Sequence, residues 1–156
     1  GVQTCALPIL TFIDGRMMTH DVGKLDSSGL LHVLGRLDDI VIVGGVNVAL
    51  SAVEAAIRHH PLIEDVAVID ITDPLWGSLP LAYVVLRSLD TDTDALTAQI
   101  KDVVAQRIGK AATPRNVHYV DQLPMLDSGK IDRLSLRLQA AQDIAQGRVR
   151  HPGTAE

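Results

Sequence analysis

The sequence is poor in aromatic residues and in cysteine, and it lacks both an excess of positive charge and a long apolar run. One Phe, one Trp and two Tyr make up 3% of its 156 residues, so a core has to be built from Val, Leu, Ile and Ala. Cys5, the single cysteine, cannot form an internal disulfide, and no Cys/His cluster has zinc-ligand spacing, so we expect no metal site and a reducing, cytoplasmic location. Nineteen acidic residues against fourteen basic ones argue against nucleic acid as a partner. No apolar run approaches the roughly 18 residues that a membrane-spanning helix requires.

The rest of the composition is that of an ordinary globular domain, with 47% hydrophobic and 21% charged residues. A chain of this length forms one domain, or a small domain with a piece of another. Residues 1–9 (GVQTCALPI) show neither helical nor strand periodicity, begin without Met and lack the features of a signal peptide. We expect them to be a non-native leader, with a disordered native terminus as the alternative. We do not expect Cys5 to act as a nucleophile, because no sequence signal pairs a histidine with it.

Turn residues between short apolar runs predict two hairpins. The first joins Val22–Leu25 to Leu30–Leu34 through an Asp-Ser-Ser-Gly turn. The second joins Ile40–Val43 to Val46–Val48 through a Gly-Gly pair.

Helical and strand patterns alternate after the second hairpin. Ser51 with Glu54 predicts a capping box that opens a helix to about His59. The other expected elements are strands at Val66–Ile71, Leu81–Leu86 and Val117–Val120, a helix from Asp92 or Thr93 to about Ile108, and a helix beginning at Asp132. These elements predict a small α+β domain with short antiparallel sheets and about three helices.

Lys130 is the first candidate for chemistry, because it follows Ser-Gly on a loop that runs into a helix (Leu123 to Lys130, LPMLDSGK). Taken alone, a surface lysine after a turn is the better interpretation. The segment is not a nucleotide-binding P-loop, since it lacks the first Gly and the final hydroxyl residue of that motif.

Asp21 and Arg36 flank the first hairpin, which would bring a carboxylate and a guanidinium together. A carboxylate can accept both ribose hydroxyls and a guanidinium suits phosphate, although a surface ion pair is the plainer interpretation. Gly44 and Gly45 permit either a tight turn or close passage of a ligand along bare backbone. Asp38 and its neighbour make a poor acid/base pair, because adjacent residues of an extended chain point to opposite faces.

Two further features are interpreted as structural. His59 and His60 lie at a helix end, where an imidazole can interact with free carbonyls, and no other residue pairs them with a metal. Trp76, the only tryptophan, is expected to pack.

Several of these signals occur together in a fixed order. They are Thr19-His20-Asp21, Gly35 to Ile40 (GRLDDI), Gly44 to Val48 (GGVNV), Val53-Glu54, His60-Pro61, Asp73 to Gly77 (DPLWG) and Leu123 to Arg133 (LPMLDSGKIDR). Their order and spacing resemble the C-terminal end of the adenylate-forming enzymes, which comprise acyl-CoA synthetases, nonribosomal peptide adenylation domains and luciferases. The resemblance extends from about Phe12 to Leu138. The GGVNV and LPMLxSGK segments are most similar to those of o-succinylbenzoate–CoA ligases of menaquinone biosynthesis.

The resemblance implies a ligase that uses ATP and Mg²⁺ to convert a small carboxylic acid to an acyl-adenylate and then passes the acyl group to coenzyme A. It implies that Lys130 is the catalytic lysine of adenylation. It further implies that Asp21 holds the ribose hydroxyls of ATP and that Arg36 contacts ribose or phosphate.

The same resemblance gives roles to residues near the second hairpin. Asp38 matches the hinge about which the small domain rotates between the two half-reactions. Gly44 and Gly45 match the turn that lines the approach of the CoA thiol. Asn47 stands where some members carry a basic residue near the nucleotide, so the resemblance makes it a candidate for binding ATP.

The resemblance also implies a domain organisation. Residues 10–37 would be the C-terminal remnant of a large AMP-binding domain, 38–146 the C-terminal lid domain and 147–156 a disordered tail. The phosphate loop, the adenine pocket, most magnesium contacts and the acyl pocket belong to the large N-terminal domain, whose sequence is absent, so we expect this chain alone to be inactive. His20 departs from the usual Thr-Gly-Asp of the family, but the ligand Asp21 is kept.

Two alternatives remain open. The chain could belong to an adenylation domain that loads a carrier protein, or it could be a stand-alone lid that acts as a binding module for a separate large domain.

Overall fold

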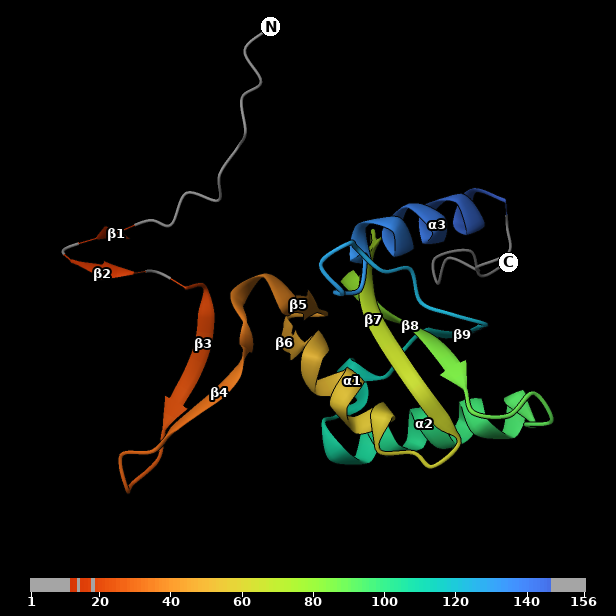
Figure 1. Cartoon of the computed structure of the whole chain (residues 1–156), viewed down its shortest axis with the longest axis horizontal. Coiled ribbons are helices and arrows are strands. Elements are labelled where there is room, and N and C mark those ends of the chain that lie inside the picture. Colours follow the sequence, from red (N-terminus) through yellow and green to blue (C-terminus); the bar gives the residue numbers. More distant parts are fainter. Residues whose placement is uncertain (1–11, 14, 18, 147–156) are drawn as a thin grey trace, which may run out of the picture. The chain divides into compact units, whose positions relative to one another are not determined.

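The computed structural model describes residues 12–13, 15–17 and 19–146. The described chain divides into two units, with the division between Asp38 and Asp39 (Figure 1). The short 3₁₀ turn η1 (Leu37–Asp39) contains the boundary between them. The leader expected at residues 1–9 and the tail expected at 147–156 lie outside the described residues.

The first unit consists of paired strands. Strands β1 (Phe12–Ile13) and β2 (Arg16–Met17) pair with each other, and β3 (Asp21–Leu25) pairs antiparallel with β4 (Leu31–Arg36). The Asp26 carboxylate closes the β3–β4 turn by accepting hydrogen bonds from the Ser28 and Leu30 amides at 2.9 and 3.0 Å. The first predicted hairpin is therefore confirmed, and a local Asp–backbone turn explains it.

The second unit is built on one five-stranded sheet. Its strands are β5 (Ile40–Val43), β6 (Val46–Ala49), β7 (Ile63–Asp73), β8 (Gly77–Leu86) and β9 (Asn116–Val120). The order is β6-β5-β8-β7, and β9 also pairs with β8. The predicted α+β fold class is confirmed, with one addition. Strand β9 runs parallel to β8, so the sheet is mixed and not purely antiparallel.

Three helices cover this sheet, namely α1 (Leu50–Arg58), α2 (Thr93–Arg107) and α3 (Arg133–Ala145), and η2 (Lys110–Ala112) is a short 3₁₀ turn after α2. The predicted starts of α2 and α3 are confirmed. Asp92, one of the two residues expected to begin α2, is its N-cap and accepts from two first-turn amides, and Asp132 is the N-cap of α3 and accepts from one.

The capping box predicted for α1 is wrong. The N-cap is Ala49 and makes no side-chain hydrogen bond, because β6 runs directly into the helix with Leu50 already buried. Ser51 therefore lies inside the first turn, where its Oγ is buried without a hydrogen-bond partner in the described part of the chain. Glu54 instead bonds to strand β7, at the Val68 amide.

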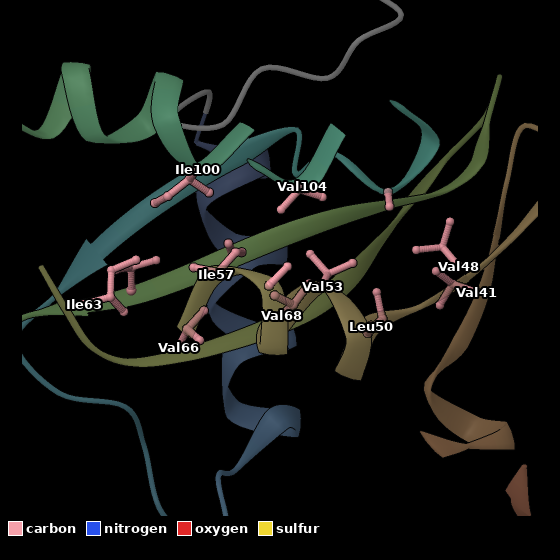
Figure 2. Close-up of a cluster of buried hydrophobic side chains, with 14 of the residues drawn as sticks. Val41, Val48, Leu50, Val53, Ile57, Ile63, Val66, Val68, Ile100 and Val104 are labelled. Carbon is pink, nitrogen blue, oxygen red and sulfur yellow. The ribbon is translucent and has the colours of Figure 1, made fainter. Parts of the chain in front are cut away.

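Two apolar clusters lie on opposite faces of the sheet. Side chains of α1 and α2, among them Val53, Ile57 and Ile100, pack with Val66 and Val68 on one face (Figure 2). On the other face, Leu136 and Ala140 of α3 pack against alternate residues of β7 and β8. Because helices cover both faces, the middle of β7 reads as an unbroken apolar run without strand alternation.

His118 on β9 makes the stability of the fold dependent on pH. Its ring stacks on Tyr83 with the centroids 5.3 Å apart, and its Nε2 is buried with no hydrogen-bond partner among the described residues. Burial lowers the pKa of His118 from the ordinary 6.5, and the charge of Asp143 opposes this only in part. The unfolded chain therefore takes up this proton more readily than the folded one.

We expect the free energy of unfolding to fall as the pH drops through 6.5, the ordinary value of the imidazole pKa. One such proton contributes a slope of at most about 1.4 kcal/mol per pH unit. Urea unfolding of the chain between pH 7.5 and 5 measures this slope. His118→Phe, which keeps a stacked ring, should remove that part of the slope; an unchanged pH profile in the variant would assign the effect to other groups.

Candidate functional site

Lys130 lies in a short loop between β9 and α3 that closes on itself. The Leu126 amide donates to the Lys130 carbonyl at 2.8 Å, and the Asp132 amide donates to the Pro124 carbonyl at 2.8 Å. Gly129 has φ of 75°, a left-handed conformation that favours glycine and turns the chain just before the lysine. The Lys130 side chain is exposed, and its ammonium has no hydrogen-bond or ion-pair partner among the described residues. The loop thus presents an unpaired positive charge.

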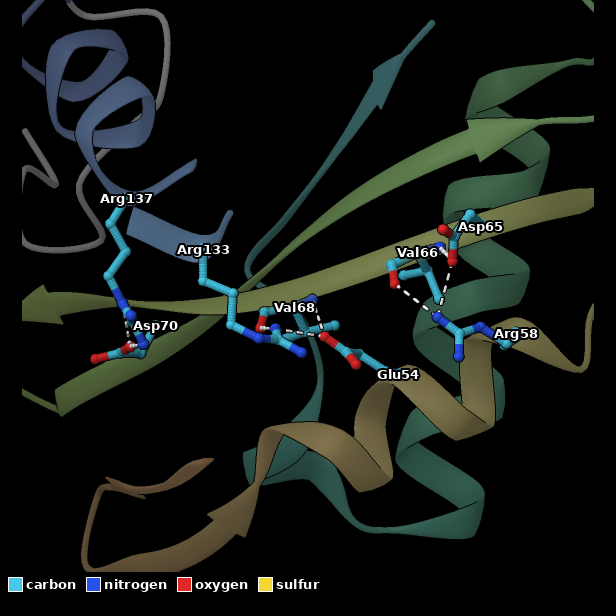
Figure 3. A network of polar contacts seen from close by, with 8 residues as sticks. All are labelled: Glu54, Arg58, Asp65, Val66, Val68, Asp70, Arg133 and Arg137. Carbon is cyan, nitrogen blue, oxygen red and sulfur yellow. Dashed lines mark hydrogen bonds and ion pairs between the residues drawn. The ribbon is translucent and has the colours of Figure 1, made fainter. Parts of the chain in front are cut away.

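The loop is anchored where helix α3 begins. Arg133 donates from Nη1 to Glu54 Oε1 at 2.6 Å and to the Val68 carbonyl at 2.7 Å (Figure 3). Glu54 is 8% exposed and also accepts from the Val68 amide at 2.7 Å. The hydrogen bond to Glu54 raises the pKa of Arg133 above its ordinary value despite desolvation, and Asp39 adds a smaller Coulombic effect in the same direction. We refer to Glu54, Val68 and Arg133 as the edge network.

A cleft of about 520 Å³ lies beside Lys130 and is lined by two further cations, Arg58 and Arg133. The Arg58 guanidinium already has partners within the protein, since its Nη2 donates to Asp65 at 2.8 Å and to the Val66 carbonyl at 3.1 Å. Arg133 is held by the edge network. Of the three cations at this cleft, Lys130 is therefore the one whose side chain bonds to no residue in the described part of the chain.

Gly44 and Gly45 form the tight turn between β5 and β6, with φ of 55° and 85°. The Gly44 amide donates to the Trp76 carbonyl at 2.9 Å, and a Cβ at Gly44 would lie 2.7 Å from the Trp76 ring. A Cβ at Gly45 would meet no atom within 4 Å. Close approach of an aromatic ring is therefore one reason for glycine at position 44.

A second cleft, of about 480 Å³, begins at this turn. Val43, Gly44, Val46 and Trp76 form part of its wall, and its cations are Lys101, Lys110 and Arg115. The Trp76 ring approaches Gly44, but Trp76 belongs to neither apolar cluster, is 48% exposed and also lines the cleft, so the packing role expected for it is correct only in part.

Sequence reasoning missed the three cations of this second cleft. They come from α2, η2 and the loop that follows, and no motif links them. Lys101 donates to the Arg115 carbonyl at 3.2 Å, which ties two of the three segments together.

Asp21 and Arg36 are brought together, as the predicted hairpin requires. They are direct partners in the β3–β4 ladder and both are exposed. Side chains of directly opposed residues share one face of a sheet. His20 beside them has φ of 59°, a left-handed conformation that explains why glycine suits this position.

Asn47 lines neither of the two clefts described above. Asp38 is in η1, at the boundary between the two units. Asn47 is exposed on β6 opposite Ile42, whereas the cleft-lining Val43 and Val46 form the next pair of the ladder, on the other face.

No three His, Cys, Asp or Glu side chains among the described residues converge as metal ligands would, and none of the helices described is long and apolar enough to cross a membrane.

Comparison with known proteins gives a consistent picture. Residues 52–130 match the family model described as the AMP-binding enzyme C-terminal domain. The chain is 37% identical to a medium/long-chain-fatty-acid–CoA ligase of Mycobacterium tuberculosis, over 81% of this chain and 23% of that protein. It is 36% identical to a 2-succinylbenzoate–CoA ligase of Listeria innocua, over 81% of this chain and 26% of the relative.

Solved structures agree in fold. The o-succinylbenzoate CoA synthetase of Bacillus subtilis, in complex with its acyl-adenylate intermediate, superposes with a TM-score of 0.71 at 32% identity. The match covers 81% of this chain and 25% of that structure. The chain thus spans about a quarter of the length of these proteins. It belongs to the AMP-binding enzyme C-terminal domain family, the small α+β domain of the adenylate-forming acyl-CoA ligases.

Proposed function

We propose that this chain is the lid of an ATP-dependent, AMP-forming carboxylic acid–CoA ligase and that Lys130 acts in the first half-reaction. The observation that carries the proposal is the unpaired ammonium of Lys130 on a closed, anchored loop. In adenylation a carboxylate oxygen bonds to the α-phosphorus of ATP while the bond to pyrophosphate breaks. Both reactants are anions, and they repel each other most where their oxygens are closest. One ammonium between them stabilises that transition state.

The second cleft fits the second half-reaction, in which the CoA thiol attacks the acyl carbonyl and AMP leaves. Coenzyme A is a long molecule with an aromatic base and several phosphates. The cleft offers the exposed Trp76 ring and three cations, and it begins at the bare backbone of Gly44. We propose that the pantetheine arm passes Gly44 and Gly45 while the cations hold phosphate groups.

The two clefts have no lining residue in common. One lid can therefore present Lys130 in one orientation and Gly44 in another. Asp38, at the boundary between the two units, is where we propose that the rotation occurs. Asp21 and Arg36 would bind the ribose and phosphate of ATP, and we assign no Mg²⁺ ligand to this chain because its described residues form no metal-ligand group.

The acid that we propose is 2-succinylbenzoate, which would place the enzyme in menaquinone biosynthesis. The likeness to the Listeria innocua and Bacillus subtilis proteins supports this choice. The fatty-acid and acetate relatives supply the competing acids.

A grafted ligase tests the proposal. In it, residues 12–146 of this chain replace the matching C-terminal region of the Listeria innocua 2-succinylbenzoate–CoA ligase. We expect acid-dependent release of pyrophosphate and formation of the CoA thioester, detected by mass spectrometry, whereas the large domain without a lid forms neither. Transfer to a carrier protein but not to CoA would favour the carrier-loading alternative, and absence of both half-reactions would favour the binding-module alternative.

To test the choice of acid, we compare how much activity this lid restores to the large domains of different ligases. The same residues are joined to the large domains of the Streptomyces coelicolor acetyl-CoA synthetase and the Mycobacterium tuberculosis fatty-acid ligase. We expect the 2-succinylbenzoate graft to recover the largest fraction of its parent's activity. A larger recovery with another partner would assign the lid to that substrate class.

Removing the cations of the second cleft should weaken CoA binding and leave adenylation unchanged. In the grafted ligase, Lys110→Ala with Arg115→Ala should raise KM for CoA about tenfold or more, since hydrogen bonds to charged groups are worth about 1.5–3 kcal/mol. Steady-state kinetics with varied CoA measures this, and pyrophosphate release without CoA is the internal reference. Equal loss in both assays would contradict a role in CoA binding.

A further inference from the structure

Strand β7 has an outer edge that no strand covers. Within the described residues it pairs only with β8, which leaves outward-facing amides and carbonyls along its other side. Charged side chains form hydrogen bonds with some of these backbone groups, one after another along the strand. Arg58 donates to the Val66 carbonyl, and Glu54 and Arg133 bind the amide and the carbonyl of Val68 (Figure 3). This arrangement protects an exposed edge from pairing with another chain.

The edge network also joins three separate parts of the domain. Glu54 comes from α1, Val68 from β7, and Arg133 is the first residue of α3, three positions after Lys130. The network is well shielded, with the side chains of Arg133 and Glu54 only 27% and 11% exposed. An ion pair held this way keeps its strength better than one at the surface.

The Lys130 loop has little freedom of its own. Backbone hydrogen bonds close it at Leu126–Lys130 and at Pro124–Asp132, so it moves as a unit about its base. Arg133 directly follows that base. A shift at the base is therefore transmitted to the lysine ammonium, and displacement of a catalytic group by about 1 Å can cost on the order of 100-fold in rate.

We propose that Arg133, held by Glu54 and the Val68 carbonyl, is a positioning residue that sets where the Lys130 ammonium lies during adenylation. The inference rests on the proposed role of Lys130. A positioning residue differs from a merely structural one because its loss affects the half-reaction that uses Lys130 and spares the other. The chain offers a matched control in Arg137, one turn further along α3, which forms an ion pair with Asp70 of the same strand at 2.9 Å.

The experiment compares both half-reactions in the grafted ligase. Arg133→Ala should slow acyl-adenylate formation at least tenfold, while thioester formation from supplied 2-succinylbenzoyl-adenylate changes less than about twofold. Arg137→Ala should leave the ratio of the two rates as it is. Arg133→Lys keeps the charge but not the guanidinium fork, and we expect an intermediate ratio. If Arg133→Ala does not fold, the ratio of the adenylation rate to the thioester-forming rate is measured in Arg133→Lys and Glu54→Gln instead.

A second measurement, made on the full chain, reports the rigidity of the loop and does not depend on catalysis. Hydrogen exchange of the Leu126, Gly129 and Asp132 amides should quicken in Arg133→Lys and stay unchanged in Arg137→Ala. Equal slowing of both half-reactions, or an unchanged ratio with unchanged exchange, would overturn the positioning role. If Lys130→Ala itself spares adenylation, the proposed function fails first; if Lys130→Ala blocks adenylation and Arg133 variants leave the ratio unchanged, only the positioning inference fails.

Discussion

Lys130→Ala in the grafted ligase should lower the rate of acyl-adenylate formation on the order of 10²–10³-fold, the usual cost of removing one group that stabilises transition-state charge. The lysine is exposed and its ammonium bonds to no described residue, so the substitution removes a charge without breaking a contact of the fold. Pyrophosphate release in the absence of CoA measures the effect. Thioester formation from supplied acyl-adenylate should stay near the parent rate, because that step uses the other cleft.

Two controls separate charge from shape at this position. Lys130→Arg keeps the positive charge and should retain part of the activity, whereas Lys130→Met keeps the length of the side chain and should not. The thermal midpoint of the chain should be the same in all of these variants. Undiminished adenylation by Lys130→Ala would contradict the mechanism, and equal loss in both half-reactions would point to a fault in the fold.

Gly44→Ala should impair the thioester half-reaction and the stability of the domain together. An L-residue at φ of 55° costs roughly 1–2 kcal/mol, and the new methyl group would in addition lie 2.7 Å from the Trp76 ring, which has to move. Overpacking of this kind adds about 1–3 kcal/mol. Because Trp76 lines the second cleft, its displacement should also raise KM for CoA, while adenylation is affected much less.

Gly45→Ala is the matched control, since its φ of 85° also imposes a backbone penalty on an L-residue but an added Cβ meets nothing within 4 Å. Urea unfolding of the chain should therefore show a larger loss for Gly44→Ala than for Gly45→Ala. In a Trp76→Ala background the cost of Gly44→Ala should fall while that of Gly45→Ala stays the same, as a double-mutant cycle would report. A difference that persists undiminished without the ring would mean that the Trp76 contact is not its cause.

Local signals predicted the elements well. The structure confirms the hairpin turns at Asp26 and at Gly44-Gly45, the helix starts at Asp92 and Asp132, and the apolar runs of β7 and β8. Each of these signals acts within a few residues. The capping-box prediction for Glu54 is wrong, and the reason is a long-range contact. The spacing of Glu54 from Ser51 fits a capping box, but its carboxylate bonds to Val68 and to Arg133, which is 79 positions away. A partly buried ion pair with two backbone hydrogen bonds outweighs one local cap.

The sequence by itself determined the class of this domain, its helices and strands, and the loop that carries Lys130, because periodicity, turn residues and caps act between near neighbours. Only the tertiary structure decided that β9 runs parallel to β8, that Glu54 and Arg133 seal the edge of β7, and that Trp76, Lys101, Lys110 and Arg115 line one cleft beside Gly44. These partners are distant along the chain, and what joins them is the burial of apolar faces on both sides of the sheet. Pair contacts made in that way leave no spacing in the sequence from which they could be predicted.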